Sequence, residues 1–224
     1  MIKNISNLGD AALYCDFGKE VNRDINTQVI KYFKSIKKEN IIGINNLTPS
    51  YNKLIVSFDL KKTNYKNIKK IIENLDINNQ DSFESKNIEI PVCSDESFSL
   101  DIKRLEEKLK IGRDKIYENF FNKEYFCYMT GFIAGMPFLG DLDVSLRAKR
   151  LETPRVKVPR GSVGLTEQFS NIYTFESPGG WNIIGNTPLN IFESSKELDP
   201  NLINPGDIVL FKRITKDEYQ SYNE

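Results

Sequence analysis

The segment SPGGWNIIGNTP, residues 177–188, holds the only tryptophan of the chain, Trp181, between two prolines and three glycines. Glycine permits backbone angles that other residues avoid, and proline fixes one of them. Their alternation around one large aromatic ring therefore specifies a defined turn followed by a strand. A second segment of this kind, PRVKVPRGSVG, lies at residues 154–164. Because so restricted a backbone holds a fixed shape, we expect the functional surface to lie in these segments.

The composition limits the class of protein. The 224 residues are 39% hydrophobic and include 14 Phe and 10 Tyr, which suffices for one large or two small domains. The formal net charge is zero, which gives no support for binding to nucleic acid or to anionic membranes. The apolar stretches are too short to span a bilayer, and residues 1–7 lack the apolar core of a secretory signal. We expect a cytoplasmic protein with no nucleic-acid or membrane partner.

The reactive residues are few. Cys15, Cys93 and Cys127 are widely spaced and without CxxC pairing, which favours reduced, buried thiols over disulfides or a metal site. The chain contains no histidine, which excludes Ser-His-Asp and Cys-His catalysis and histidine-ligated zinc within this chain. Acid–base chemistry must therefore come from Asp, Glu, Lys, Tyr or a partner protein.

The first third of the chain predicts a small α/β domain, residues 1–84. The pattern predicts a strand at 13–17 and a helix that begins with Asp24 as its N-cap. Two more strands and a second helix follow, which gives the order β-α-β-β-α and a domain of ferredoxin-like type. The polar, unpatterned residues 78–85 predict the domain boundary.

The remainder, residues 85–224, has a different pattern. A strand at 88–92 precedes a helix capped by Ser99 and a short helix at 114–121. Short strands separated by Gly/Pro turns predict a barrel or sandwich, and so an α+β protein as a whole. These strands are expected at residues 125–130, 156–158, 171–175, 181–184 and 207–212.

Residues 131–143, GFIAGMPFLGDLD, form the first candidate for a binding site. One interpretation is a tight connection packed on the core. The other is the wall of an apolar cleft, with Phe132 and Phe138 as ligand contacts and Asp141 or Asp143 as a polar anchor.

A basic segment at residues 147–160 forms the second candidate, although such a cluster is also typical of a solvated face. The rigid turn around Arg155 favours an arginine held for a carboxylate or phosphate, with backbone N–H groups of residues 161–164 facing the same anion. The segment is not a phosphate-binding P-loop, since it lacks GK[ST]. Ser177 has no histidine base, which favours hydrogen bonding over a nucleophilic role, and Trp181 is expected in the core or in a cleft wall.

Six sequence blocks occur in an order that resembles one family. GD.AL stands at residues 9–13, P.Y.SL.V is approximated at 49–56, and PGD closes the series at 205–207. Between them lie GF…PFLG.LD, TPR..VP.GSVG and ESPGGW.IIG.TP. Together they resemble the allophanate hydrolase subunit 1 family, also called the KipI family, of carboxyltransferase C/D type, which includes one of the subunits of 5-oxoprolinase.

The resemblance implies a C-terminal cyclophilin-like β-barrel and partners from the allophanate hydrolase subunit 2 (KipA) and LamB/YcsF families. It implies an ATP-dependent amidohydrolase that is active only with its partners. ATP, with Mg²⁺, would serve the complex, and this chain would bind neither metal nor biotin. The implied reaction opens 5-oxo-L-proline to L-glutamate. Two alternatives stay open, a KipI-like inhibitor of a sensor histidine kinase and an allophanate hydrolase or urea carboxylase-like subunit with another amide substrate.

The chain departs from the family pattern at residues 135–136, at Asp141 and at residues 165–171, where the family's Gln–Thr pair is altered. If that pair touches substrate, the departure implies a different substrate or a reduced activity. The sequence does not identify catalytic residues. The expected substrate-binding residues are Phe132, Pro137, Phe138, Arg155, Ser162, Gln168, Tyr173, Ser177, Gly179, Gly180 and Trp181.

Overall fold

The computed structural model describes residues 1–77, 85–196 and 198–222. The chain divides into two compact units, Met1–Glu84 and Ser85–Glu224. The boundary segment predicted at residues 78–85 lies outside the described residues, apart from Ser85. In the described part of the chain, no helix has both the length and the apolar character needed to cross a membrane.

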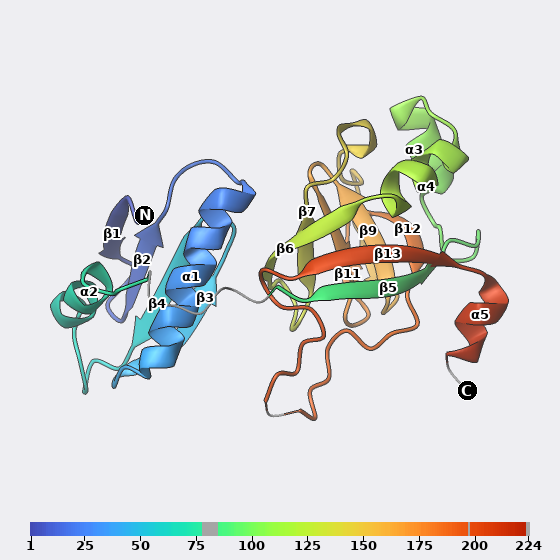
Figure 1. Ribbon diagram of the computed structural model, residues 1–224. Helices are drawn as coiled ribbons and strands as arrows, with labels where there is room; N and C mark the ends of the chain where they lie inside the picture. Colours follow the sequence, from blue (N-terminus) through green and yellow to red (C-terminus); the bar gives the residue numbers. More distant parts are fainter. Residues whose placement is uncertain (78–84, 197, 223–224) are drawn as a thin grey trace. The chain divides into compact units, whose positions relative to one another are not determined.

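The N-terminal unit is a four-stranded antiparallel sheet covered by two helices (Figure 1). Leu13, Cys15, Leu54 and Val56 alternate along two neighbouring strands, and their side chains are fully buried on one face of the sheet. Both helices pack their apolar residues against this face. In the sheet order β1-β2-β4-β3, the elements are β1 (Asn4–Asn7), β2 (Ala12–Asp16), β4 (Lys53–Phe58) and β3 (Ile44–Pro49), with helices α1 (Arg23–Glu39) and α2 (Tyr65–Glu73).

Two details of this unit differ from the sequence-based expectation. The N-cap of α1 is Asn22, whose side chain accepts a hydrogen bond from the backbone N–H of Ile25 at 3.0 Å, and not Asp24, which lies in the first turn. The sequence pattern also misses strand β1, because its sequence NISN carries only one buried residue, Ile5. Strand β1 pairs with β2 and thereby covers one edge of the sheet, in which β4 lies between β2 and β3.

The C-terminal unit is built around a closed barrel, which confirms the prediction of a barrel-containing α+β protein (Figure 1). Neighbouring strands are antiparallel except for β5 and β13, which run parallel. Strands β8 (Arg155–Val158) and β11 (Ser177–Gly179) form a separate two-stranded ribbon. The barrel order is β10 (Phe169–Ile172), β7 (Pro137–Gly140), β6 (Glu124–Thr130), β13 (Ile208–Ile214), β5 (Asn87–Cys93), β12 (Asn182–Asn186) and β9 (Ser162–Thr166).

Helices extend the core of the barrel. The buried residues of α3 (Ile102–Leu109) and α4 (Arg113–Phe121) belong to the same apolar cluster as the interior of the barrel. The two helices lie side by side next to the strands in Figure 1. A 3₁₀ turn, Val144–Leu146, and a short terminal helix, α5 (Lys216–Ser221), complete the unit.

The predicted elements of this unit are found with shifted ends. The N-cap of α3 is Asp101 and not Ser99, whose hydroxyl instead donates to the carbonyl of Ile184 at 2.8 Å. Strands β7 and β9 lie in segments whose glycines and prolines predict rigid loops. All five residues of β9 are buried, so the strand lacks the alternation of polar and apolar residues that marks a half-buried strand.

An aromatic cluster in the barrel unit gives a test of the fold. Phe211 is 1% exposed, and its ring lies 5.0 Å from that of Phe120 and 5.3 Å from that of Tyr125. We expect Phe211→Ala to lower the free energy of unfolding by about 3–5 kcal/mol, because it leaves a cavity among these rings. The neighbouring Leu210 is 40% exposed, and Leu210→Ala should cost about 1 kcal/mol or less. Urea unfolding followed by Trp181 fluorescence measures both variants, and equal losses would contradict the packing described.

Candidate functional site

A small pocket in the barrel unit gathers most of the aromatic candidates. Its volume is about 90 Å³, which is small beside the roughly 300–1,000 Å³ of sites for drug-sized ligands. It can hold one small ring or a short side chain. The lining residues are Phe132, Met136, Phe138, Arg150, Asn171, Tyr173, Gly179, Gly180 and Trp181.

Aromatic rings form one wall of this pocket. Trp181 is 6% exposed, and its ring meets that of Phe138 edge to face at 5.7 Å. Phe132 is 73% exposed and has a φ of +69°, a backbone conformation that is costly for a bulky residue. Gly179 is required where it lies, because a Cβ there would overlap the hydroxyl of Tyr173. The Pro-Gly-Gly turn therefore brings the backbone of Gly179 against Tyr173, and Trp181 follows directly after this turn.

Two buried polar side chains lie at the pocket. Asn171, which is 1% exposed, donates from Nδ2 to the sulfur of Met136 at 3.5 Å. Its Oδ1 is buried and has no hydrogen-bond partner within the described residues. Burial raises the pKa of Tyr173, an effect partly offset by hydrogen bonds from the Asn171 side chain and the Trp181 backbone and by the charges of Arg150 and Arg155. The phenol of Tyr173 is therefore protonated at neutral pH.

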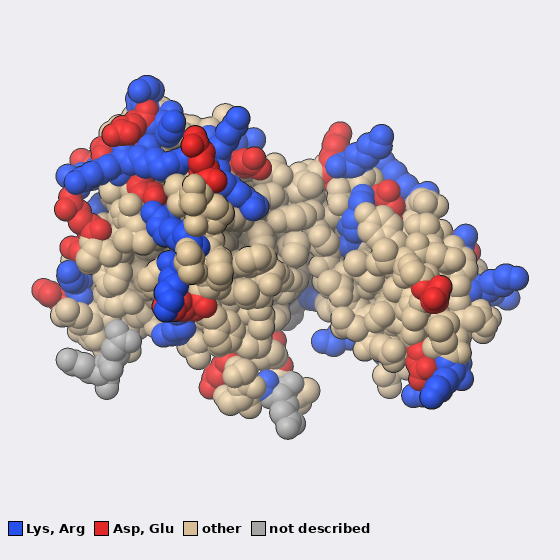
Figure 2. Space-filling model, turned by 180° about the vertical axis from the view of Figure 1, so that it is seen from behind, with Lys and Arg blue, Asp and Glu red and all other residues tan. Residues whose placement is uncertain are grey.

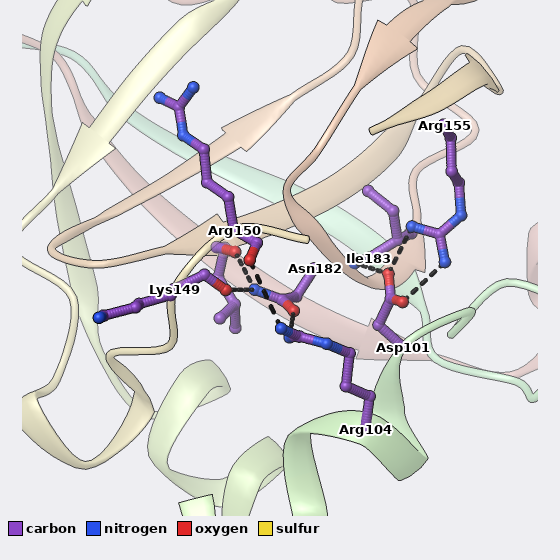
Figure 3. Close-up of polar contacts among 8 residues, drawn as sticks. Asp101, Arg104, Lys149, Arg150, Arg155, Asn182 and Ile183 are labelled. Atoms are coloured by element: carbon purple, nitrogen blue, oxygen red, sulfur yellow. Dashed lines mark hydrogen bonds and ion pairs between the residues drawn. The ribbon is translucent and has the colours of Figure 1, made fainter. Parts of the chain in front are cut away.

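Arg150 brings a positive charge to the same pocket. Its guanidinium carbon lies 5.7 Å from the centre of the Trp181 ring. The backbone carbonyl of Arg150 accepts a hydrogen bond from Arg104 at 3.4 Å, and Arg104 also donates to Asn182. Figure 3 shows the side chain of Arg150 extending away from this network. The network thus fixes the backbone of Arg150 and leaves its guanidinium for other contacts.

Arg155, the predicted anion-binding arginine, is paired within the chain. Its two terminal nitrogens donate to the carboxylate of Asp101 at 2.9 and 2.7 Å (Figure 3). Asp101 is 4% exposed and also accepts the backbone N–H of Ile183 at 2.7 Å. Arg155 does not line the pocket. In the described structure it joins the β8 ribbon to the N-cap of α3, and through Asp101 to β12.

The remaining predicted residues lie apart from the pocket lining. Ser162 is buried at the start of β9, and Pro137 is buried in β7. Gln168 lies in the turn between β9 and β10, where its carbonyl accepts the N–H of Leu142 at 2.9 Å. Ser177 is 9% exposed in the β8–β11 ribbon, and its Oγ has no hydrogen-bond partner among the described residues.

The two aspartates expected as polar anchors have structural partners. Asp141 accepts a hydrogen bond from the hydroxyl of Tyr128 at 2.7 Å. Asp143 caps the 3₁₀ turn by accepting from the hydroxyl and the backbone N–H of Ser145, and these bonds lower its pKa. Neither aspartate lines the pocket. Within residues 1–77, 85–196 and 198–222, no three His, Cys, Asp or Glu side chains are grouped as a metal site.

The cysteines are not available as nucleophiles. All three are free and buried, as the sequence predicts. Burial raises the pKa of Cys15 to about 12 and raises the pKa of Cys127 further above its ordinary value. Their thiols therefore stay protonated and act as small apolar side chains.

Surface charge does not mark a second site on the face shown in Figure 2, where lysine and arginine side chains are interspersed with aspartate and glutamate. This mixture agrees with the formal net charge of zero. The electrostatics of the pocket are therefore set by the individual side chains near it, above all Arg150.

Sequence reasoning found Phe132, Phe138, Tyr173, Gly179, Gly180 and Trp181 at the pocket, and it missed Met136, Arg150 and Asn171 as lining residues. Arg150 belongs to the basic segment, but nothing in the spacing distinguishes it from Arg155. Asn171 lies in a segment whose sequence predicts an ordinary strand, and nothing in that sequence marks Asn171 as a lining residue. Its burial beside an aromatic wall appears only in three dimensions.

Comparison with known proteins assigns the chain. The family model for the carboxyltransferase domain, subdomain C and D, matches residues 3–203. The chain belongs to this family. The carboxyltransferase C/D chain is 31% identical to the B subunit of 5-oxoprolinase from Bacillus subtilis, over 98% of its own length and 96% of that protein. It is 30% identical to the B subunit of 5-oxoprolinase from Haemophilus influenzae, over 93% and 96% of the two chains.

A solved structure agrees with the fold. The crystal structure of TTHA0988 superimposes with a TM-score of 0.83 at 25% identity and covers 92% of this carboxyltransferase C/D chain. The matched region is 40% of that chain, so the same fold forms part of a longer polypeptide there. The family recognised from the ordered sequence blocks is confirmed.

The pairing of Arg155 with Asp101 predicts a loss of stability when the arginine is replaced. We expect Arg155→Gln to lower the free energy of unfolding of the barrel unit by about 3 kcal/mol, because it leaves the buried Asp101 carboxylate without its ion-pair partner. Lys157 lies on the same strand, and its side chain, 75% exposed, pairs with Glu176. Lys157→Gln should cost less than about 1 kcal/mol. Urea unfolding followed by Trp181 emission compares the two, and a similar small loss in both would show that the pair is not structural.

Proposed function

We propose that this chain is a subunit of an ATP-dependent 5-oxoprolinase complex, which hydrolyses 5-oxo-L-proline to L-glutamate. The observation that carries the proposal is the match to a 5-oxoprolinase subunit along nearly the full length of both proteins. The match includes the segments that form the pocket, because it spans 98% of this chain. These relatives support the broader statement that the chain is part of an amidohydrolase-related complex.

The chemistry of the pocket supports a binding role for this chain within the complex. Aromatic walls and a few polar groups suit a small ring, whereas the described lining residues include no general base. The raised pKa of Tyr173 makes its phenolate rare at neutral pH, and the chain has no histidine. We therefore infer that a partner protein supplies the groups that transfer protons.

The nucleotide does not fit this pocket. A volume of about 90 Å³ is too small for a nucleoside triphosphate, and the nearby Arg155 is already bound by Asp101. We propose that ATP, with Mg²⁺, is held by a partner protein and that this chain holds no metal or biotin.

The proposed partners are proteins of the allophanate hydrolase subunit 2 (KipA) and LamB/YcsF families. The longer chain of TTHA0988, of which this fold is only a part, supports a further protein segment working beside this unit. We further propose that the barrel is cyclophilin-like and that the first unit is a ferredoxin-like variant. In that variant, β1 takes the edge position beside β2.

Co-expression with the two partners tests the function. We expect the purified complex to release ADP and L-glutamate only when both 5-oxo-L-proline and ATP are present. Each protein omitted in turn is the control, and this chain alone should show almost no turnover because its pocket lacks a base. A folded three-protein complex without this activity would refute the proposal. In that case, inhibition of a sensor histidine kinase and hydrolysis of another amide are the next functions to assay.

A further inference from the structure

Among the described residues, the guanidinium of Arg150 is held at the pocket without a carboxylate of its own. The ion pairs of these residues involve other side chains, among them Arg155 with Asp101 and Arg113 with Glu96. The guanidinium carbon of Arg150 lies 5.7 Å from the centre of the Trp181 ring, and this cation–π contact leaves the guanidinium N–H groups able to donate to a ligand. An arginine in this position can bind a carboxylate through two parallel hydrogen bonds.

Of the described residues that line the pocket, Arg150 is the one that carries a charge. The positive charges of Arg150 and Arg155 both act on the hydroxyl of Tyr173. The neutralising partner of Arg155 is the buried Asp101, whereas no acidic residue of the described chain lines the pocket itself. An anionic group on a ligand would therefore be attracted to the Arg150 side of the pocket.

Asn171 and Tyr173, which both line the pocket, carry an acceptor and a donor. Asn171 Oδ1 is a buried acceptor without a partner in the described structure, which is costly unless a ligand donates to it. The Tyr173 hydroxyl, which is protonated, lies against Gly179 and can donate. A planar amide with one N–H and one carbonyl presents the complementary pair.

The rings complete the description of the ligand. Trp181 and Phe138 offer apolar surface within about 90 Å³, which admits a single small ring. Phe132 remains exposed at the pocket in a costly backbone conformation, as expected of a side chain kept for a ligand and not for the core.

We propose that this pocket is a binding site for a small cyclic amide that carries a carboxylate, with Arg150 binding the carboxylate, Trp181 and Phe138 the ring, and Asn171 and Tyr173 the amide. The proposal deepens the proposed function and rests on it for the identity of the ligand, 5-oxo-L-proline. It assigns recognition of the substrate's carboxylate to this chain.

The single tryptophan makes a direct binding test, since Trp181 lines the pocket. The 224-residue chain is titrated with 5-oxo-L-proline while Trp181 emission is recorded, and calorimetry checks the affinity. We expect a saturable change. 2-Pyrrolidinone lacks the carboxylate, and L-proline lacks the lactam carbonyl and carries a positively charged ring nitrogen in place of the neutral amide. Each should bind at least about ten-fold more weakly than 5-oxo-L-proline.

The decisive variant is Arg150→Gln, which removes the charge from an exposed side chain and should leave the fold intact. We expect about ten-fold or greater loss of affinity for 5-oxo-L-proline and no change for 2-pyrrolidinone. Lys149→Gln is the matched control, because it removes the same charge from the adjacent exposed residue, whose side chain points elsewhere in Figure 3. Its affinity should stay within about two-fold of the parent chain.

The outcomes separate this site from the function proposed for the complex. No saturable binding, or equal affinity in Arg150→Gln and the parent chain, overturns the site even if the complex hydrolyses 5-oxo-L-proline. Arg150-dependent binding in a chain whose complex is inactive supports the site and refutes the 5-oxoprolinase function. Equal affinity for 5-oxo-L-proline and 2-pyrrolidinone also overturns the assignment of the carboxylate to Arg150.

Discussion

The hydrogen bonds of the Asp101 carboxylate hold together the segments next to the candidate pocket. It accepts two hydrogen bonds from Arg155 and one from the backbone of Ile183, so three separate segments meet at one buried anion. A buried carboxylate is stable only when its lone pairs are satisfied, which fixes all three partners together. Because Ile183 lies two residues after Trp181, and Arg155 lies on the strand that pairs with β11, the same contact positions the aromatic wall and the Pro-Gly-Gly turn. Asp101 also occupies the N-cap of α3 without making a side-chain capping bond there.

A second set of contacts places Arg150. Asn182 donates to the carbonyls of Lys149 and Leu165 at 3.2 and 3.0 Å, and Arg104 bridges Asn182 to the carbonyl of Arg150. The N–H of Leu151 reaches the carbonyl of Gly180 at 2.7 Å. These bonds hold the backbone of the basic segment against β12, and only side-chain torsions of Arg150 remain to be ordered by a ligand. Binding to a backbone that is already ordered loses little conformational entropy.

The sequence predicts the architecture better than the site, for physical reasons that particular residues make clear. Alternation at Leu54, Val56 and Phe58 reflects a strand with one buried face, and the strand is found there. β9 has no such alternation because it is buried throughout, and β7 is short and bounded by Pro137 and Gly140. The Gly/Pro segments indicate where the pocket lies, since a backbone held in one conformation is rich in glycine and proline, and these residues can be read directly from the sequence. They do not identify which arginine faces it: Arg155 is bound by a residue 54 positions away, and that pairing is not encoded by local spacing.

The described lining residues of the pocket include groups that can recognise a ligand and no general base. A general base needs a group that is deprotonated at working pH and within reach of the substrate. Tyr173 is within the pocket but has a raised pKa, and Ser177 is near the turn but buried in the ribbon with no base beside it in the described structure. The groups at the pocket are instead of the kinds that recognise a ligand. They are a cation, an amide, a phenol and the faces of aromatic rings. If one chain recognises the substrate and another transfers the protons, the reaction would proceed only in the assembled complex, because neither surface alone could complete it.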